Sequence, residues 1–252
     1  MDKPVINGHD IVRVFDDAAH LAREGAARFA ELATASIKLR GSFHAALAGG
    51  STPKAMYSLL AGEAGRGIDW SKVHIYWGDE RCVPPEHPDS NAGAAMAALT
   101  SHVSIPASQI HRMRGELGAK AAADEYETLL RALARGGCLF DLILLGMGAD
   151  GHTASLFPDR DFSRDHGYLA LATVAPPASP IKDRVTITFD AIQASRHVLL
   201  LIAGKDKTEM FARVRAARRD NLSGPSVPPT ALVRAETTEW YLDRAASGCL
   251  QA

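Results

Sequence analysis

Residues 146–152 read GMGADGH and directly follow the apolar run 142–145, which is typical of a buried strand. In open parallel sheets, ligands bind at the carboxyl ends of the strands, so this turn would present Asp150 and His152 to a ligand. Histidine titrates near neutral pH and is the commonest general acid or base. Of the ten histidines in the chain, we therefore predict that His152 is catalytic, with Asp150 in the same site.

The three glycines of this turn also satisfy the dinucleotide-binding pattern GxGxxG. That pattern requires a continuous helix after the turn, and then a second strand that ends in an acidic residue about 20 positions later. Here Pro158 interrupts the chain after one or two helical turns, and residues 159–165 form a polar loop. The context therefore argues against dinucleotide binding.

A second turn, GGSTPK at residues 49–54, also follows an apolar run. We expect Thr52 to be the N-cap of the next helix and Pro53 to be its first residue. Free amides, two hydroxyls and the positive end of a helix dipole together favour an anion such as phosphate at Gly50, Ser51 and Thr52. The spacing GxxxxGK[ST] of a Walker loop is absent. The alternative is a well-capped helix with no ligand.

A third polar group, Asp79, Glu80 and Arg81, follows the apolar run 73–77. Two carboxylates and a guanidinium at a strand end could orient a base, hold sugar hydroxyls or clamp a phosphate in bidentate fashion. They could equally form a self-contained ion pair, which contributes little on a protein surface. The residues themselves leave both interpretations open.

Further cations stand near strand ends. Lys205 and Lys207 open a helical segment after the apolar run 198–203, and Arg184 opens an alternating segment. Lysines in a first helical turn oppose the helix dipole, which indicates a nearby anion. Each cation taken alone is most often a solvated charge. The indication of a bound anion is that several cations occur near strand ends.

The elements that must position these residues are visible as short apolar runs that alternate with segments of helical period. This alternation is typical of parallel strands joined by crossover helices. Four runs end at a glycine: 43–48, 73–77, 142–145 and 198–203. The sequence therefore predicts an α/β fold with a mostly parallel sheet, and it predicts a site built from the turns at the strand ends.

Two helices and one further strand are also predicted. Apolar stripes at residues 22–33, after Asp16 or Asp17 as N-cap, and at 122–133 are typical of helices that cover a sheet. Residues 185–189 alternate apolar side chains with threonines, which predicts a strand with one polar face. We expect this strand to lie at a sheet edge.

Composition narrows the class of protein. The chain has 252 residues, of which 46% are hydrophobic and 23% charged, as in globular proteins. Its proline-rich stretches are short and resemble loops rather than domain linkers, so we expect a single domain over residues 1–252. The formal charge of 28 − 29 = −1 argues against a nucleic-acid binder held mainly by charge, although a localised basic patch stays open.

The cysteines and the apolar runs indicate the cellular compartment that we expect for the protein. Cys82, Cys138 and Cys249 are odd in number and far apart, without metal-site spacing, as expected in a reducing cytoplasm. Residues 1–10 contain no apolar block, and the longest purely apolar run, 198–203, is far shorter than the roughly 20 residues of a membrane helix. We expect neither an export signal nor a membrane span.

Taken together, these segments resemble the 6-phosphogluconolactonases of the short bacterial type, which share a family with glucosamine-6-phosphate isomerases. Four blocks carry the resemblance: 47–54, 78–84 with 89–91, 144–158, and 184–186 with 204–207. The third block, LLGMGADGHTASLFP, is the most specific. The resemblance implies a Rossmann-like three-layer α/β/α sandwich with a mostly parallel central sheet, of the NagB/RpiA/CoA transferase-like kind.

The resemblance further implies hydrolysis of 6-phospho-D-glucono-1,5-lactone in the pentose phosphate pathway, with no required cofactor or metal. It implies a small sugar-phosphate lactone as partner, and a monomer is expected, with weak self-association left open. His152 matches the family's catalytic base, and Asp150 or Asp79 would fix its tautomer or lie near the sugar ring. The positions that match phosphate ligands are Ser51, Thr52, Arg81, Arg184 and either Lys205 or Lys207.

Glucosamine-6-phosphate deaminases share three of these motifs and are the main alternative. In them a glutamate five residues after the histidine assists ring opening, whereas this chain has Phe157, which cannot relay a proton. Arg81 also stands where deaminases favour an aromatic residue, and both departures favour the lactonase. A non-catalytic sugar-phosphate sensor is a further alternative. A serine hydrolase is disfavoured because no GxSxG elbow is present.

Overall fold

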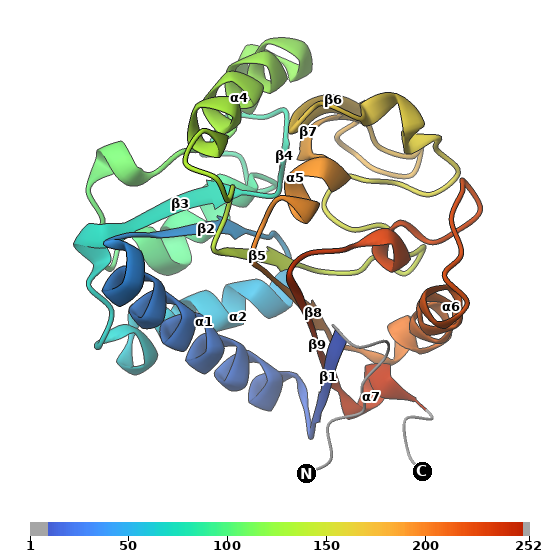
Figure 1. Ribbon diagram of the computed structural model, residues 1–252, viewed down its shortest axis with the longest axis horizontal. Helices are drawn as coiled ribbons and strands as arrows, with labels where there is room; N and C mark the ends of the chain where they lie inside the picture. The colour runs from blue at the N-terminus through green and yellow to red at the C-terminus, as the bar shows by residue number, and fades with distance from the viewer. Residues whose placement is uncertain (1–9, 249–252) are drawn as a thin grey trace.

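The computed structural model describes residues 10–248 (Figure 1). Its strands are β1 (Asp10–Phe15), β2 (Phe43–Leu47), β3 (Val73–Trp77), β4 (Asp79–Arg81), β5 (Leu142–Leu145), β6 (Ala170–Val174), β7 (Asp183–Ile187), β8 (His197–Ile202) and β9 (Thr237–Asp243). Its α-helices are α1 (Ala18–Arg40), α2 (Ser51–Ala61), α3 (Asn91–Ala95), α4 (Ala119–Ala134), α5 (Phe189–Gln193), α6 (Thr208–Arg219) and α7 (Arg244–Ser247). Two features of the sequence lie outside the described residues: Cys249, and residues 1–9 of the N-terminal stretch in which no export signal is expected.

A six-stranded parallel sheet runs through the centre of the molecule in the order β1-β9-β8-β5-β2-β3 (Figure 1). The four strands expected from apolar runs are confirmed as β2, β3, β5 and β8. The residue pattern does not predict β1 and β9, because charged residues such as Arg13 and Glu239 interrupt their apolar sequence.

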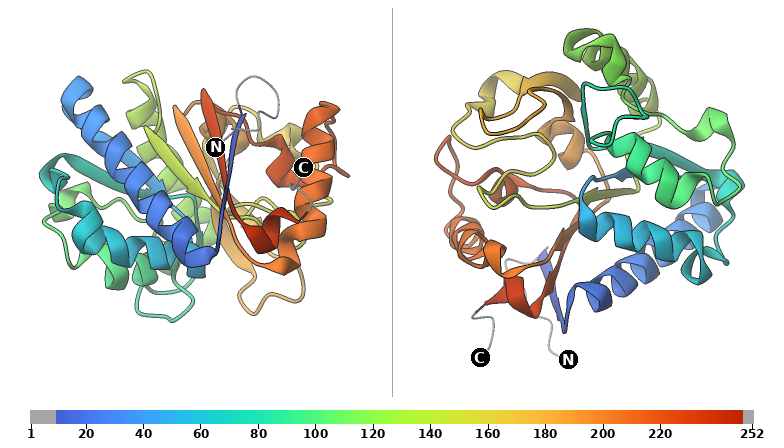
Figure 2. Two further views of the ribbon diagram at one scale, coloured as in Figure 1. Left: turned by 90° about the horizontal axis from the view of Figure 1, so that it is seen from below. Right: turned by 180° about the vertical axis from the view of Figure 1, so that it is seen from behind.

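The chain reverses its winding direction between β2 and β5. Helices α1 and α2 join β1 to β2 and β2 to β3 on one face of the sheet, whereas α4 connects β3 to β5 across the other face (Figures 1 and 2). The crossovers therefore diverge where β2 and β5 lie side by side. In doubly wound sheets, this switch point is where ligands bind, outside the carboxyl ends of the strands.

Both faces of the sheet are buried, which explains the unbroken apolar runs. Successive strand residues point to opposite faces. In β5, Leu142 and Leu144 pack against the side of α1 and α2, whereas Ile143 and Leu145 pack against the side of α4 and α6. Parallel strands covered on both sides read as continuous apolar sequence rather than as an alternation. The result is a three-layer sandwich, as the family resemblance implies.

The two predicted covering helices are confirmed as α1 and α4. Of the two aspartates considered as N-cap, Asp17 caps α1, because its carboxylate accepts a hydrogen bond from the amide of His20 (2.7 Å). The helix ends at Gly41, whose φ of 84° is the left-handed conformation that glycine tolerates best.

A second, antiparallel sheet of three strands has the order β4-β7-β6. The expected strand at residues 185–189 overlaps β7 only at 185–187, because Thr188 is the N-cap of α5 and Phe189 begins that helix. Its placement at an edge is wrong, since β7 is the central strand of this sheet. Two polar residues of β7 are buried rather than solvated, since Arg184 is 6% exposed and Thr186 is 0% exposed, whereas Asp183 at the strand's start is exposed. The alternation of apolar residues and threonines in this segment therefore reflects buried polar side chains, and not a strand face that is open to water.

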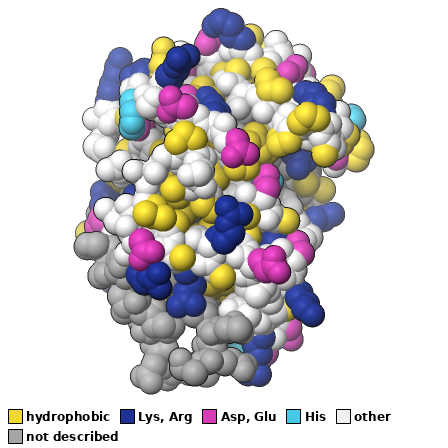
Figure 3. Space-filling view, turned by 90° about the vertical axis from the view of Figure 1, so that its right-hand side faces the viewer, with side chains coloured by type: hydrophobic (Ala, Val, Ile, Leu, Met, Phe, Trp, Pro, Cys, Tyr) yellow, Lys and Arg dark blue, Asp and Glu magenta, His cyan; other side chains and the backbone are white. Residues whose placement is uncertain are grey.

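Charged side chains of both signs are mixed across the surface seen in Figure 3, with hydrophobic side chains between them. No helix among residues 10–248 is long and apolar enough to cross a membrane. Likewise, no group of three or more His, Cys, Asp or Glu side chains in this range is arranged to hold a metal ion.

Candidate active site

A cavity of about 280 Å³ opens at the switch point, where the carboxyl ends of β2, β5 and β8 meet the turn after β3. Its polar lining comprises Ser51, Thr52, Asp79, Arg81, Asn91, His152, Thr153 and Lys207. Its apolar lining includes Leu144, Leu145, Leu201 and Ile202. Seven of the ten predicted site residues line this cavity, whereas Asp150, Arg184 and Lys205 do not.

The turn after β2 delivers the N-terminus of α2 to the cavity. The helix begins at Ser51, with Gly50 as its N-cap at a φ of 101°. The expected Thr52 cap is therefore wrong: the helix starts earlier because glycine can adopt the positive φ that admits Ser51 into the first turn. No side chain caps this helix end. The hydroxyls of Ser51 and Thr52 lie with the dipole's positive end at the cavity wall.

His152 and Asp150 form a pair in the turn after β5. The His152 ring nitrogen Nδ1 donates to Asp150 Oδ1 (2.6 Å), and the backbone amide of His152 donates to the same oxygen (3.1 Å). Burial raises the pKa of the Asp150 carboxyl, but its hydrogen bonds to His152 outweigh burial, and the pKa falls below its usual value. Asp150 is therefore ionised at neutral pH, which places the proton of a neutral His152 on Nδ1.

The close approach of this pair to the backbone requires glycine at position 148. A Cβ on Gly148 would lie 2.2 Å from Nδ1 of His152 and 2.5 Å from Oδ1 of Asp150. The ring of His152 also contacts Phe157, with 5.1 Å between the ring centroids. The segment after β5 forms turns and no helix, as expected from the argument against a dinucleotide.

Asp79 is the other acid that the sequence left open for orienting the histidine. Its Oδ2 accepts from the hydroxyl of Ser155 (2.6 Å), and its Oδ1 accepts from Nδ2 of Asn91 (3.1 Å). These contacts hold the Asp79 carboxylate in the cavity wall, while Asp150 is the acid bonded to His152. Sequence reasoning missed Ser155, although it lies within the most specific block.

Glu80 does not form the ion pair with Arg81 that the sequence left open. Its carboxylate is 2% exposed and accepts hydrogen bonds from the amides of Asn91 and Ala92 (both 2.7 Å) at the start of α3. Burial raises the pKa of Glu80, and these backbone hydrogen bonds oppose the rise. Glu80 is thus a buried helix cap that fixes the position of Asn91.

The predicted cations divide into two groups. Arg81 and Lys207 line the cavity, whereas Lys205 is exposed outside it. Arg81 donates to the carbonyl of Asp89 (2.5 Å), and no carboxylate in the described range lies within ion-pair distance of it. Arg184 is the register partner of Arg81 across β4 and β7. Burial, and next the charge of Arg81, lower the pKa of Arg184.

One nitrogen of Arg184, Nη1, is buried without a hydrogen-bond partner, and Nη2 donates to Ser179 (2.7 Å). Two guanidiniums side by side, one of them with an unsatisfied donor, repel each other, and the carboxylates of Asp79 and Asp89 oppose part of this repulsion. This arrangement therefore favours negative charge at the Arg81 side of the cavity.

Two buried tyrosines anchor the strand ends that carry the site, and sequence reasoning missed both. Tyr57 Oη accepts from the amide of Ala48 (3.0 Å) and donates to its carbonyl (2.8 Å), which ties β2 to α2. Tyr126, in α4, makes the same two contacts with Trp77 at the end of β3. Their only sequence signal is an aromatic residue on an apolar helical stripe, which the core explains equally well.

A doubly wound α/β protein with a partly cationic cavity at its switch point, and an acid–histidine pair beside that cavity, has the features of an enzyme for small anionic ligands. The family model described as glucosamine-6-phosphate isomerases/6-phosphogluconolactonase matches residues 16–242. The chain belongs to this family.

Relatives and solved structures are consistent with the family. The chain is 36% identical to the 6-phosphogluconolactonase of Mycobacterium leprae over 94% of this chain and 96% of that protein. It is 28% identical to the crystal structure of 6-phosphogluconolactonase from Thermotoga maritima, with a TM-score of 0.80 over 93% of this chain and all of the other. A monomeric glucosamine-6-phosphate deaminase aligns with a TM-score of 0.78 at 22% identity, which shows a shared fold alone.

Proposed function

We propose that this protein hydrolyses 6-phospho-D-glucono-1,5-lactone to 6-phosphogluconate, a step of the pentose phosphate pathway. The observation that carries the proposal is the Asp150–His152 pair at the edge of a cavity lined by Arg81 and Lys207. The relatives named 6-phosphogluconolactonase support the same reaction.

His152 is the general base in this proposal. Its Nδ1 is engaged by Asp150, which leaves Nε2 as the nitrogen with no protein partner in the described range. Nε2 takes a proton from water as the water oxygen attacks C1 of the lactone, and the Asp150 carboxylate stabilises the imidazolium that forms. The imidazolium then returns the proton to the ring oxygen as the C1–O bond breaks, so that one histidine acts twice.

The lactone oxygen gains negative charge in the attack and requires a donor. The amides of Gly148, Gly151 and His152 already donate within their own turn. We therefore assign this role to the amide of Met147, which belongs to the same turn and lines the cavity.

Phosphate recognition is proposed for two walls of the cavity. The amide-rich start of α2, with Gly50, Ser51 and Thr52, faces the same space as Lys207 and offers donors without a competing side-chain cap. Arg81, backed by Arg184, supplies the second cationic group. Binding energy from the phosphate then holds C1 against His152 without itself taking part in the reaction.

Asp79 is proposed to accept hydrogen bonds from sugar hydroxyls. Both of its oxygens already accept from protein donors, so it is anchored, and each carboxylate oxygen has a further lone pair for a ligand. Asn91, which lines the cavity next to it, completes this wall.

The deaminase alternative is disfavoured by the neighbour of His152. A ring-opening histidine in that reaction works with a glutamate at the position of Phe157, and here the aromatic ring packs against the imidazole.

The proposal is tested by following acid release from the lactone at neutral pH against the rate in buffer, because the lactone also opens spontaneously. Wild-type protein should exceed the buffer rate, and His152→Ala should lower kcat by about 10² to 10⁴-fold. Full turnover in His152→Ala would refute the assignment of the base. Ammonia release from glucosamine 6-phosphate would instead support the deaminase, and binding without turnover would support a sensor.

A further inference from the structure

The turn that carries His152 rests on a segment almost 80 residues away in sequence, the 3₁₀ helix Pro229–Leu232. Thr230 in this helix is completely buried. Its backbone amide donates to the carbonyl of Gly151 (3.0 Å). Its hydroxyl Oγ1 lies 2.8 Å from the same carbonyl and 3.2 Å from the carbonyl of His152, so its single proton can be shared between the two. Thr230 therefore holds the peptide that joins Gly151 to His152.

The same segment closes sterically over Gly151. This residue has a φ of 86°, and a Cβ on it would lie 2.8 Å from both Cβ of Pro228 and Sδ of Met210. Met210 belongs to α6, which starts directly after Lys207 in the cavity wall. The turn is thus packed against the 228–230 segment and α6, with no room for a side chain at position 151.

The 3₁₀ helix is itself a fixed support. The guanidinium of Arg218 donates to the carbonyls of Ala231 (3.2 Å) and Val233 (2.5 Å), and it pairs with the carboxylate of Asp10 in β1. All of these contacts are buried. Thr230 is therefore anchored to the sheet through Arg218 and transmits that rigidity to the turn.

From these contacts we infer that Thr230 is a positioning residue for His152. Thr230 is not part of the cavity lining, so it acts through the Gly151–His152 peptide and not on the ligand. The inference rests on the proposed role of His152 as general base. A catalytic group displaced by a fraction of an ångström loses much of its effect on the rate, because proton transfer needs a close and aligned geometry.

The test variant is Thr230→Val, which removes the hydroxyl and keeps the shape. It should fold, because the Gly151 carbonyl keeps the backbone amide of residue 230 and the His152 carbonyl keeps the amide of Gly148 (2.8 Å). We expect kcat for the lactone to fall roughly tenfold with KM changed less than about twofold, since ligand contacts are untouched. Thr230→Ser, which restores a hydroxyl, should recover kcat to within about twofold to threefold of wild type.

The matched control is Thr188→Val. Thr188 is also buried, and its hydroxyl donates to the carbonyl of Tyr168 and accepts from the amide of Ala191. This variant should lose stability to a similar degree or more and keep wild-type kcat. Equal losses of kcat in the two valine variants, an unchanged kcat in Thr230→Val, or failure of the serine rescue would each overturn the inference.

A second measurement separates this inference from the proposed function. Amide hydrogen exchange of residues 147–152 reports on the turn without any substrate. Exchange should be faster in Thr230→Val and unchanged in Thr188→Val. Unchanged exchange in Thr230→Val would refute the role of Thr230 even if His152→Ala is inactive. Full turnover in His152→Ala would refute the proposed role of His152 as general base and, with it, the positioning role of Thr230, whatever the exchange result.

Discussion

Asp150 Oδ1 and His152 Nδ1 lie 2.6 Å apart, and the amide of His152 donates to the same carboxylate oxygen. Two residues separated by one glycine thus form an ordered acid–imidazole pair within a single turn. The pair is arranged by local backbone geometry and needs no ligand to assemble. The orientation of Nε2 is consequently built into the fold before substrate binds.

Replacing the acid of this pair should affect the reaction step more than binding. Asp150→Asn removes the charge that stabilises the imidazolium and lets the side-chain amide favour the wrong tautomer. We expect kcat to fall about 10²-fold or more with little change in KM. Asp161→Asn, which alters a fully exposed aspartate outside the cavity lining, serves as the control and should keep wild-type kcat. Loss of KM alone in Asp150→Asn would contradict the proposed role.

Gly148 and Gly146 provide a matched pair of glycines in the same turn. Gly148→Ala places a Cβ against both Asp150 and His152, so it should separate the pair and lower kcat more than about tenfold. A Cβ on Gly146 meets no protein atom within 4 Å, so Gly146→Ala should leave the Asp150–His152 pair in place and, although Gly146 lines the cavity, should lower kcat less than Gly148→Ala. Steady-state kinetics on both variants, with circular dichroism to verify folding, test the prediction. Equal effects at the two positions would speak against a steric cause.

The cavity cations should act on the phosphate and not on the reacting carbon. Arg81→Met and Lys207→Met each remove one charge from the cavity, and each should raise KM for the phosphorylated lactone by about 10 to 100-fold. Lys205→Met changes an exposed lysine two residues from Lys207 and should leave KM unchanged. Measuring hydrolysis of unphosphorylated glucono-1,5-lactone distinguishes a loss of phosphate binding from a structural defect of the variant. Equal losses on both lactones would show that the cations are not phosphate ligands.

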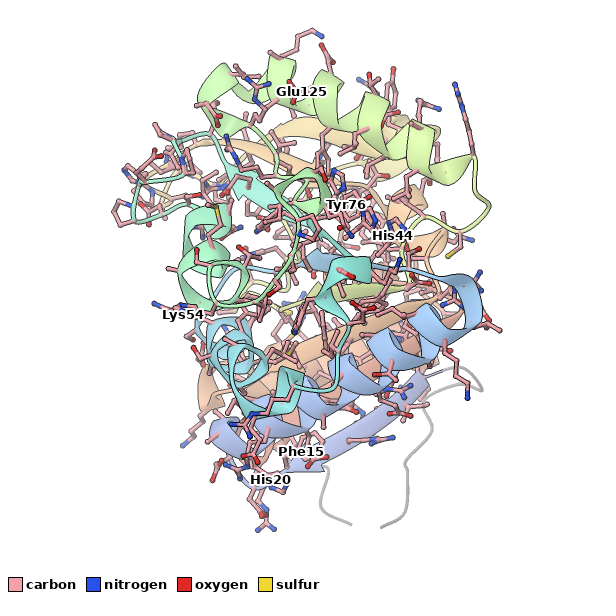
Figure 4. All side chains as sticks on the ribbon, turned by 90° about the vertical axis from the view of Figure 1, so that its left-hand side faces the viewer. Phe15, His20, His44, Lys54, Tyr76 and Glu125 are labelled. Atoms are coloured by element: carbon pink, nitrogen blue, oxygen red, sulfur yellow. The ribbon has the colours of Figure 1, made fainter. Side chains whose placement is uncertain are left out.

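Three histidines stack at the edge of the sheet, away from the cavity. The rings of His44 and His74 have centroids 4.5 Å apart, and Nδ1 of His74 lies 3.2 Å from Nε2 of His111. Figure 4 shows His44 beside Tyr76, whose hydroxyl lies 3.2 Å from Nδ1 of His44. Burial and then the neighbouring His74 lower the pKa of His44 to about 4, against the pull of the Asp141 carboxylate. Burial also lowers the pKa of the other two rings.

This stack should make the protein less stable in mild acid. The folded pKa of His44 lies below its unfolded value near 6.5, so the unfolded chain takes up protons first as the pH falls from 6.5 towards 4. We expect the free energy of unfolding to drop by about 1 kcal/mol or more between pH 7 and pH 5. The size of this drop is limited because the rings are only half-buried and water screens their charges. Urea denaturation at several pH values measures this drop. His44→Gln should reduce it, whereas the exposed His102→Gln should not.

The sequence by itself determined the strands that form the centre of the sheet and the turns that follow them. Runs such as 142–145 are apolar on both faces because parallel strands are covered by helices on both sides, and this signal is local. The turn that follows this run contains both members of the Asp150–His152 pair, and the acid, the glycine and the histidine are neighbours in the chain. For these features, short-range chemistry and geometry were sufficient.

Only the tertiary structure decided which distant residues support and complete the site. It separated Lys207 from Lys205, moved Glu80 from a surface ion pair to a buried helix cap, and set Arg184 behind Arg81 by pairing β4 with β7. It also brought Thr230 against the His152 turn. These relationships depend on strand order and on packing between elements far apart in sequence, and no local pattern of residue types records them. A hydroxyl such as that of Thr230 becomes informative only when the carbonyls that it meets are known.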